Sequence, residues 1–404
     1  MMPKSFLHLL SFRFFTTVAM QMKMTILSYL LYKVTKEPLS LGLLGLYEAL
    51  PRIVMSLPAG YIVERMEKRK ALSFVVTSYF LLSILLVMAV YLFQENPIFL
   101  KYSFFGIVFV MGLIGSLGPS ASVSMFSHII PKDQTPRYSA INSNAWQIGA
   151  ILGPILGGFL LYKIGEFYSI ILVSCFLSIS VFSVFLLPKS PSHNTLPFSI
   201  SNSIAQIKEG LEYVFNNKIL LWAISLDLFA VLFGGAVALL PVFAEDILHV
   251  GASGYGMLKA AMPLGSAIMM FFLAAKPLHK NAGKWLLISV FFFGIFTIVF
   301  AISKSIYISL AALFLIGAFD AVSVIVRGTL LIMETPENMK ARVTSVNQMF
   351  ISSSNEIGAF ESGIAAQYMG TIRSVIFGGC MTIFFVILAF AKGKELKNFE
   401  FEKN

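Results

Sequence analysis

Charged residues are scarce in this chain of 404 residues. Asp, Glu, Lys and Arg make up 12% of the sequence, whereas hydrophobic residues make up 57%. Soluble globular domains carry about 25% charged residues, so the composition excludes that class. We therefore expect a protein that crosses a lipid bilayer several times. The net charge of +10 comes from basic residues in short loops between apolar stretches, so it indicates membrane orientation and no nucleic-acid partner.

Cysteine and histidine are also scarce. The two cysteines, Cys175 and Cys380, each lie in an apolar stretch, so we expect small packing residues and no disulfide framework. The five histidines are scattered, without the spacing of a catalytic or metal-binding cluster. No glycine-rich phosphate-binding loop with a lysine occurs, which excludes ATP as the energy source. We expect no catalytic residue, no metal and no cofactor, and an embedded enzyme or a scaffold is a remote alternative.

Twelve apolar stretches are each long enough to cross a bilayer, which takes about 20 helical residues. We expect an all-α membrane protein with twelve transmembrane helices in two six-helix bundles, residues 1–187 and 219–391. A cytoplasmic linker, 188–218, carries an amphipathic helix that we expect on the inner membrane surface, and the cytoplasmic tail, 392–404, is expected to be frayed. The stretches cover residues 6–34, 39–62, 71–93, 102–127, 138–162, 167–187, 219–244, 252–275, 284–302, 306–326, 342–368 and 373–391.

The two halves repeat one another, which supports this division. A shift of 205 places superposes a series of identical residues without a gap. Such a series marks a duplicated structural unit. The superposed pairs are Pro131 and Pro336, Arg137 and Arg342, Asn142 and Asn347, Gly153 and Gly358, Gly158 and Gly363, Gly165 and Gly370, Ser169 and Ser374, and Cys175 and Cys380.

Lysine and arginine are unevenly distributed between the loops. With the N-terminus inside, twenty of them fall on the cytoplasmic side, Arg327 among them, and six fall on the opposite side. Cytoplasmic loops of membrane proteins are enriched in these residues, so we expect both termini in the cytoplasm.

A run of glycines lies in the fifth stretch. Glycines four residues apart leave a groove on one helix face where another helix can approach closely, and a proline among them favours a bend. The expected role is tight helix packing. The run consists of Gly149, Gly153, Pro154, Gly157 and Gly158.

The loop after the second stretch combines acids with a basic cluster. Glu64 lies one turn after Gly60, and Arg65, Arg69 and Lys70 follow it. An acid at a helix end beside cations can form a charge lock between helices on the cytoplasmic side. Anchoring by the positive-inside rule alone is the alternative.

These motifs resemble those of a known family. The run Gly149–Gly158 resembles the antiporter motif in the fifth helix of major facilitator superfamily exporters, and the loop resembles the cytoplasmic motif of that superfamily, with Glu64 where Asp is usual. Residues 317–327 and 354–363 resemble the enterobactin-exporter-like branch. The resemblance implies alternating access, with helices 1, 4, 7 and 10 around a central cavity, and proton-coupled export of siderophores or drugs. This chain lacks the Arg in span four that many drug/proton antiporters of the superfamily carry.

Nine charged residues lie well inside the apolar stretches, away from their ends, where an ionised side chain costs at least about 2.5 kcal/mol. We expect them to pair or to line a wet cavity. Arg13, Asp227 and Asp320 fall at similar depths on the cytoplasmic side. Two nearby carboxylates repel, so one can hold a proton that an approaching cation releases, and we expect these three residues to couple transport to protons. In the alternative, Asp320 forms a polar stripe with Ser323 and Arg327 on its own helix.

A second set of charges is expected on the outer side. Arg52 lies one helical turn after Glu48 and at the depth of Glu356, and Glu361 lies at the depth of Glu48. Arg52 thus has acidic partners in both halves, which is what a gate that breaks and reforms requires. A static Glu48–Arg52 pair is the alternative.

Four residues are candidate substrate contacts. We expect Lys23 and Lys259 near the outer surface, where their long side chains can reach water. Facing the cavity, they would suit an anionic cargo such as a catecholate or carboxylate chelator. Asn347 and Asn355, from the eleventh stretch, complete the set.

These features favour a secondary active transporter that exports a small amphipathic molecule, a siderophore or a drug, in exchange for protons. We expect a multi-pass protein of the bacterial cytoplasmic (inner) membrane that acts as a monomer in the lipid bilayer. The same fold can run in either direction, so an uptake symporter or a facilitator for a lipid, metal or metabolite is the alternative.

Overall fold

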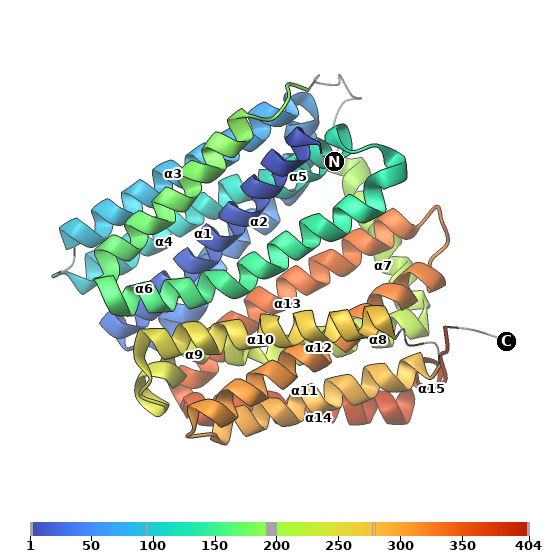
Figure 1. The fold of residues 1–404 in the computed structure, drawn as a ribbon. Coiled ribbons are helices and arrows are strands. Elements are labelled where there is room, and N and C mark those ends of the chain that lie inside the picture. Colours follow the sequence, from blue (N-terminus) through green and yellow to red (C-terminus); the bar gives the residue numbers. More distant parts are fainter. Residues whose placement is uncertain (1–2, 94, 191–199, 277, 279, 402–404) are drawn as a thin grey trace. The chain divides into compact units, whose positions relative to one another are not determined.

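The structure is a computed structural model that describes residues 3–93, 95–190, 200–276, 278 and 280–401. This described part of the chain is almost entirely helical and contains no strand (Figure 1). Its elements are α1 Lys4–Thr35, α2 Pro38–Arg65, α3 Lys68–Phe93, α4 Pro97–Gly115, α5 Leu117–Ile129, η1 Lys132–Gln134, α6 Thr135–Phe185, α7 Ile200–Asn216, α8 Lys218–Phe233, η2 Gly235–Leu239, α9 Leu240–Val242, η3 Phe243–Ile247, α10 Gly251–Ala275, α11 Ala282–Ile302, α12 Ile306–Glu334, α13 Lys340–Met369, α14 Thr371–Lys392 and α15 Lys394–Lys397.

Most of these helices can span a membrane. Nine in the described part are long and apolar enough, and α2 becomes the tenth when Pro38–Met55 and Pro58–Arg65 count as one broken span. The 51 residues of α6 contain the predicted stretch 138–162 and all but the last two residues of the stretch 167–187. The remaining predicted span coincides with α13, which has 30 residues but a more polar sequence. The helices are therefore consistent with twelve crossings.

Glycine marks the turn between the last two spans of each half. Gly165 interrupts α6 with a φ of +77°, and Gly370 separates α13 from α14 with a φ of +86°. Side chains with a Cβ strongly disfavour such positive φ angles. The two glycines are equivalent positions of the sequence repeat, so both halves make this turn in the same way.

The chain forms two compact units. Each takes a short segment from the half of the chain that mainly builds the other unit, namely the start of α10 for unit 1 and the start of α2 for unit 2. The predicted bundle boundaries stay a prediction, and residues 191–199 of the predicted linker lie outside the described residues. Unit 1 comprises Met1–Lys36, Leu43–Phe198 and Val250–Ala260, and unit 2 comprises Glu37–Gly42, Ser199–His249 and Ala261–Asn404.

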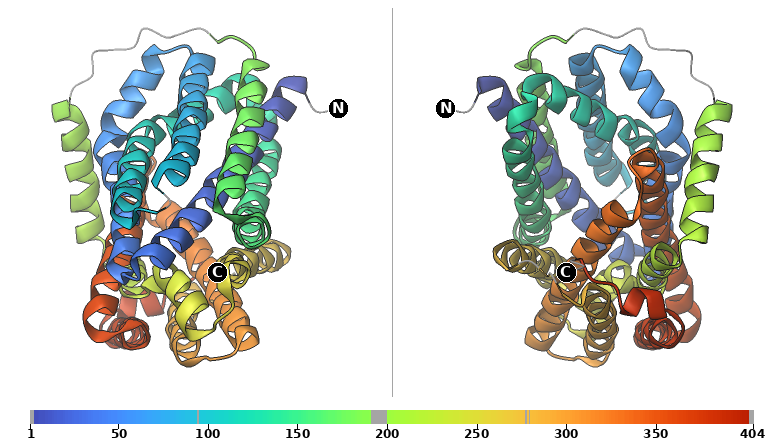
Figure 2. Two further views of the ribbon diagram at one scale, coloured as in Figure 1. Left: turned by 90° about the vertical axis from the view of Figure 1, so that its left-hand side faces the viewer. Right: turned by 90° about the vertical axis from the view of Figure 1, so that its right-hand side faces the viewer.

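Each unit is a bundle of helices packed side by side. In unit 1, α1 packs along α6, and α3 packs against α4, α5 and α6. In unit 2, α11 packs against α12 and α14, and α8 packs against α13 and α14. Figure 2 shows the blue to green helices of unit 1 running alongside one another, as do the orange to red helices of unit 2.

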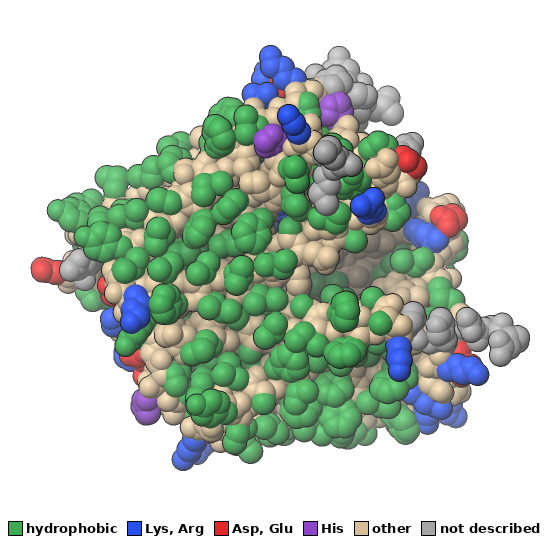
Figure 3. Space-filling view, in the orientation of Figure 1, with side chains coloured by type: hydrophobic (Ala, Val, Ile, Leu, Met, Phe, Trp, Pro, Cys, Tyr) green, Lys and Arg blue, Asp and Glu red, His purple; other side chains and the backbone are tan. Residues whose placement is uncertain are grey.

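Hydrophobic side chains cover the outside of the helices. On the face drawn in Figure 3 they spread over the helix sides, while Lys, Arg, Asp and Glu gather near the helix ends. This distribution suits contact with lipid. The prediction that Cys175 and Cys380 are interior packing residues is wrong, since both are exposed. A small apolar thiol is tolerated on a helix face that contacts lipid.

Helix α7 forms where the amphipathic pattern predicts a helix, and part of its apolar face packs against protein. Val214 is 2% exposed, and Ile207 and Leu211 pack beside it in the core of unit 2. The Tyr213 hydroxyl donates a hydrogen bond of 2.6 Å to the carbonyl of Glu334 at the end of α12. Protein therefore covers part of this face, while Phe215 remains 59% exposed, and the position of the helix on the membrane surface stays a prediction.

The end of the chain is docked as well. Leu396 of α15 is fully buried, and the backbone N–H of Gly283 donates a hydrogen bond of 3.2 Å to the carbonyl of Phe399. The prediction of a frayed tail is wrong for residues 394–401, because apolar side chains among its charges find a place in the core of unit 2. Residues 402–404 lie outside the described residues.

Candidate functional site

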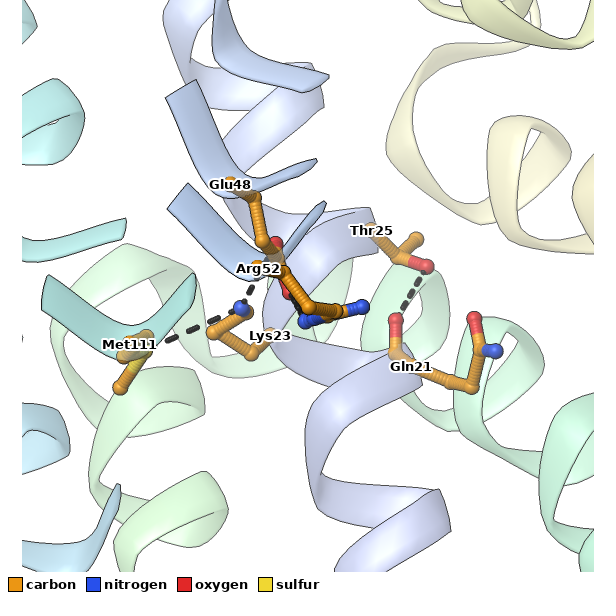
Figure 4. Close-up of polar contacts among 6 residues, drawn as sticks. All are labelled: Gln21, Lys23, Thr25, Glu48, Arg52 and Met111. Atoms are coloured by element: carbon orange, nitrogen blue, oxygen red, sulfur yellow. Dashed lines mark hydrogen bonds and ion pairs between the residues drawn. The ribbon is translucent and has the colours of Figure 1, made fainter. Parts of the chain in front are cut away.

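Three charged side chains form a cluster inside unit 1 (Figure 4). One carboxylate oxygen of Glu48 lies 3.1 Å from Nζ of Lys23, and the other lies 2.8 Å from Nη2 of Arg52. Glu48 therefore bridges a cation of α1 and a cation one turn further along α2. The side chain of Lys23 is 1% exposed, so its charge depends on this carboxylate.

The cluster contains the predicted Glu48–Arg52 pair. It also contains Lys23, whose side chain does not extend toward water as the sequence suggested. The Lys23 ammonium points into unit 1 and lies 3.8 Å from the sulfur of Met111 on α4 (Figure 4). The side chain turns inward because the carboxylate of Glu48 lies at the same depth on the neighbouring helix α2. Its assignment as a substrate contact stays a prediction.

Two glycines allow α4 to approach this cluster. A Cβ at Gly112 would overlap the carbonyl oxygen of Glu48. A Cβ at Gly115 would overlap the hydroxyl of Tyr79, from α3, and would lie 3.5 Å from the guanidinium of Arg52. Small residues of this kind bring helix backbones close together in membranes. Helices α1 to α4 thus enclose the charges in a tightly packed setting.

The other two predicted cations of unit 1, Arg13 and Lys259, form no ion pair within contact distance of an acid among the described residues of that unit. Nζ of Lys259 lies 5.7 Å from the ring centroid of Tyr255, which stacks on Tyr29 at 5.9 Å. Such an aromatic face attracts a cation. The Nε of Arg13 is buried and makes no hydrogen bond to any described residue.

A second buried ion pair lies in unit 2. Asp227 of α8 pairs with Arg327 of α12, and Nε of Arg327 donates a hydrogen bond of 3.2 Å to the hydroxyl of Ser323. Both charged residues are 7% exposed. The sequence count placed Arg327 among the cytoplasmic loop cations, and this is wrong. The predicted span ended at residue 326, whereas α12 continues to Glu334.

Asp320 lines a pocket beside this ion pair, so two of the predicted proton-coupling residues share one site. Asp320 makes no hydrogen bond or ion pair with any described residue. The polar stripe suggested by the sequence is therefore incomplete, because Arg327 contacts Ser323 and Asp227 but not Asp320. Among the lining residues are Asp227, Asp320, Ser289, Ser323, Phe293 and Phe319.

Helix α13 carries the remaining predicted residues. Glu361 accepts a hydrogen bond of 3.5 Å from the hydroxyl of the next residue. The amide of Asn355 is exposed and donates a hydrogen bond of 2.8 Å to the backbone one turn earlier. Glu356 and Asn347 are partly exposed. These residues belong to unit 2, whereas Arg52 and Arg13 belong to unit 1, so the gate and the contact of Arg13 with the acids stay predictions.

The cytoplasmic loop motif joins helices of unit 1. Arg69 donates a hydrogen bond of 3.1 Å to a carbonyl just past the end of α6. Arg65 lies over the ring of a neighbouring tyrosine, and Lys70 pairs with a glutamate of its own turn. Glu64 is exposed, and a Cβ at Gly60 would meet no atom within 4 Å. The arginines of the motif therefore act in local packing, and its role as a lock stays a prediction.

The glycine run of α6 packs closely on two helices. A Cβ at Gly153 would lie 2.6 Å from the side chain of Gln21 on α1, and a Cβ at Gly158 would overlap the carbonyl oxygen of Ala252 on α10. The spacing therefore produces the tight packing expected of it. The other members of the run are Gly149 and Gly157, which approach α1, and Pro154, whose carbonyl oxygen approaches α10.

Comparison with known proteins assigns the family. The sequence profile of the Major Facilitator Superfamily matches residues 9–359. The chain belongs to the major facilitator superfamily. Superfamily members are secondary transporters that work by alternating access, and they are not enzymes.

Several superfamily members are similar in sequence. The enterobactin exporter EntS of Shigella flexneri is 23% identical over 290 residues, which cover 71% of this chain and 68% of the relative. The same exporter of Salmonella typhi is 26% identical over 290 residues, 71% of this chain and 69% of the relative. The uncharacterized MFS-type transporter YfmI of Bacillus subtilis is 23% identical over 276 residues, 67% of each chain.

Solved structures confirm the major facilitator fold. A POT family transporter in complex with 5-aminolevulinic acid superposes with a TM-score of 0.77 at 11% identity, over 98% of this chain and 97% of that chain. The nucleoside transporter NupG superposes with a TM-score of 0.75 at 13% identity, over 96% of this chain and 99% of that chain. The likeness shows the predicted all-α membrane fold, and it names no cargo.

Sequence reasoning named Arg327 only as part of an alternative polar stripe, and not as the partner of Asp227. Its signal was present, since Asp320, Ser323 and Arg327 follow at intervals of three and four residues on one helix face. The partnership of Lys23 with Glu48 had no such signal, because it joins two helices. Only the packing of α1 against α2 reveals it.

Proposed function

We propose that this transporter is a proton-coupled antiporter that exports a small amphipathic molecule, a siderophore or a drug, across the bacterial cytoplasmic membrane. The likeness to relatives named as enterobactin exporters supports export. The excess of Lys and Arg in the loops on one side supports cytoplasmic termini. The protein works as a monomer, and its partners are the cargo, protons and the bilayer.

The observation that carries the proposal is that one of two acids in the same pocket has an ion-pair partner and the other has none among the described residues. Arg327 neutralises Asp227, whereas Asp320 has no ion-pair partner among the described residues. An ionised group in the membrane costs at least about 2.5 kcal/mol, and a bound proton removes that charge. Asp320 is therefore the group that takes and releases the coupling proton. Asp227 and Arg327 hold the pocket, and Arg13 approaches it in one access state.

The cluster of unit 1 supports the proposal for the outer gate. Glu48 binds Lys23 and Arg52 together, and the side chain of Arg52 is 42% exposed. An exposed guanidinium at one edge of a buried cluster can exchange acids without breaking the Lys23 pair. In this scheme Arg52 exchanges between Glu48 and the acids of α13, Glu356 and Glu361.

Proton movement in reconstituted vesicles tests the coupling. The full chain is reconstituted with a trapped pH-sensitive dye and an imposed proton gradient, and enterobactin and ethidium are added in separate experiments. We expect at least one of them to drive proton movement through the wild type and neither to do so through Asp320→Asn. Glu337→Gln, which changes an acid that is 90% exposed, is the matched control and should behave as the wild type. Unchanged movement in Asp320→Asn would remove this residue from the mechanism.

A further inference from the structure

We infer that the pocket at Asp320 binds the protonated primary amine of an amphipathic molecule. The inference rests on the proposed function and deepens it, because it names the chemical class of a cargo. Its basis is the charge, size and lining of the pocket in unit 2.

The charge of the pocket favours a cation. Asp227 and Arg327 neutralise one another, and the Nε of Arg327 is also occupied by Ser323. The remaining charge is the carboxylate of Asp320, which forms no hydrogen bond or ion pair with any described residue. An anionic group placed here would be repelled by the unpaired carboxylate of Asp320, whereas an ammonium would supply the missing counter-ion.

The size and lining of the pocket narrow the choice to a small cationic group. The space has room for one group about the size of a water molecule, which an ammonium matches and a bulky quaternary centre exceeds. The rings of Phe293 and Phe319 contribute to the wall. Phe319 stacks on Phe292 at 5.0 Å and on Phe296 at 5.8 Å, so its ring is held in place. Aromatic walls attract a cation and cover an apolar chain that follows it.

Lys23 of unit 1 does not provide a comparable binding site for an anion. The ammonium of Lys23 is already paired with Glu48, and its side chain is 1% exposed. An anionic cargo would have to displace Glu48 to reach it. The amine pocket therefore replaces the anion contact that the sequence suggested for Lys23.

Three fluorescent probes with the same dansyl group and similar linkers test the inference. Dansylcadaverine ends in an ammonium, a second compound ends in a hydroxyl in place of the amine, and a third ends in a carboxylate. Each is titrated into the purified full chain in detergent, and its fluorescence is recorded. We expect the ammonium probe to bind at least tenfold more tightly than the other two. Equal or tighter binding of the hydroxyl or carboxylate probe would overturn the inference.

Variants of the pocket assign the binding to its residues. Asp320→Asn conserves shape and should remove the preference for the ammonium probe, whereas Glu337→Gln should retain it. Phe319→Leu should weaken binding of the ammonium probe by about twofold to thirtyfold, whereas Phe319→Tyr should leave its binding unchanged. Each variant is first checked for wild-type elution and thermal unfolding. A full ammonium preference in folded Asp320→Asn would overturn the inference.

The two proposals fail in different ways. If the ammonium preference depends on Asp320 but vesicles show no coupled proton movement, the amine pocket stands and the proton coupling is refuted. If Asp320→Asn abolishes proton movement but leaves probe binding unchanged, the coupling stands and the amine pocket is refuted.

Discussion

The substitution Glu48→Gln tests the cluster of unit 1 most sharply. It keeps the shape of the side chain and removes the charge that Lys23 and Arg52 share. Breaking a buried ion pair by removing one partner lowers the free energy of unfolding by about 3–5 kcal/mol, because the other charge stays buried. Lys23, 1% exposed, carries this effect, whereas Arg52, 42% exposed, can reach solvent.

The companion substitution Lys23→Met should have a smaller effect. It removes the buried ammonium and leaves Glu48 with its second cation, Arg52, at 2.8 Å. Because Glu48 keeps Arg52 as an ion-pair partner after this change, no buried charge is left unpaired, and we expect a loss of about 1 kcal/mol or less. In the double variant no ammonium is left unpaired, and most of the stability lost by Glu48→Gln should return.

A double-mutant cycle in mixed micelles measures this coupling. The free energy of unfolding is obtained for the wild type, both single variants and the double variant by titration with sodium dodecyl sulfate. We expect an interaction of at least about 2 kcal/mol between the two sites. Additive effects of Lys23→Met and Glu48→Gln would refute the reasoning, since they would show that neither charge depends on the other.

Two further predictions concern packing. Gly112→Val should lower the free energy of unfolding by about 1–3 kcal/mol, because its Cβ would overlap the Glu48 carbonyl, whereas Gly106→Val, with no atom within 4 Å, should have little effect in the same titration. Leu396→Ala should cost about 2–5 kcal/mol, because this side chain is fully buried in unit 2, and it should speed cleavage of the chain end by trypsin. Asn398→Ala, at an exposed position, is the control, and equal cleavage of both variants would contradict the docking of the tail.

The spans and their duplication could be predicted because they depend on local properties. A stretch of about 20 apolar residues must be helical in lipid, since its backbone groups have no other partners there. An ion pair between side chains of one helix could be predicted equally well, as Glu48 and Arg52 show. The turn glycines Gly165 and Gly370 could be found as a repeated pair.

Contacts between helices could not be predicted in the same way. Lys23 meets Glu48 only because α1 packs against α2 at one particular rotation, and the glycines of α4 let that helix approach α2 from another side. Arg327 was misplaced because the rule that assigns cations to cytoplasmic loops takes no account of a buried acid such as Asp227 on another helix. The apolar residues of α7 and α15 were read as facing lipid or water, since nothing local distinguishes a protein partner from a membrane.

The most direct test of the central claim, that Asp320 carries the coupling proton, is the number of protons moved per cargo molecule in vesicles at an imposed gradient. We expect the wild type to move protons in proportion to enterobactin or ethidium, and Asp320→Asn to move none above the protein-free background. Equal proton-to-cargo ratios for the two proteins would contradict the account.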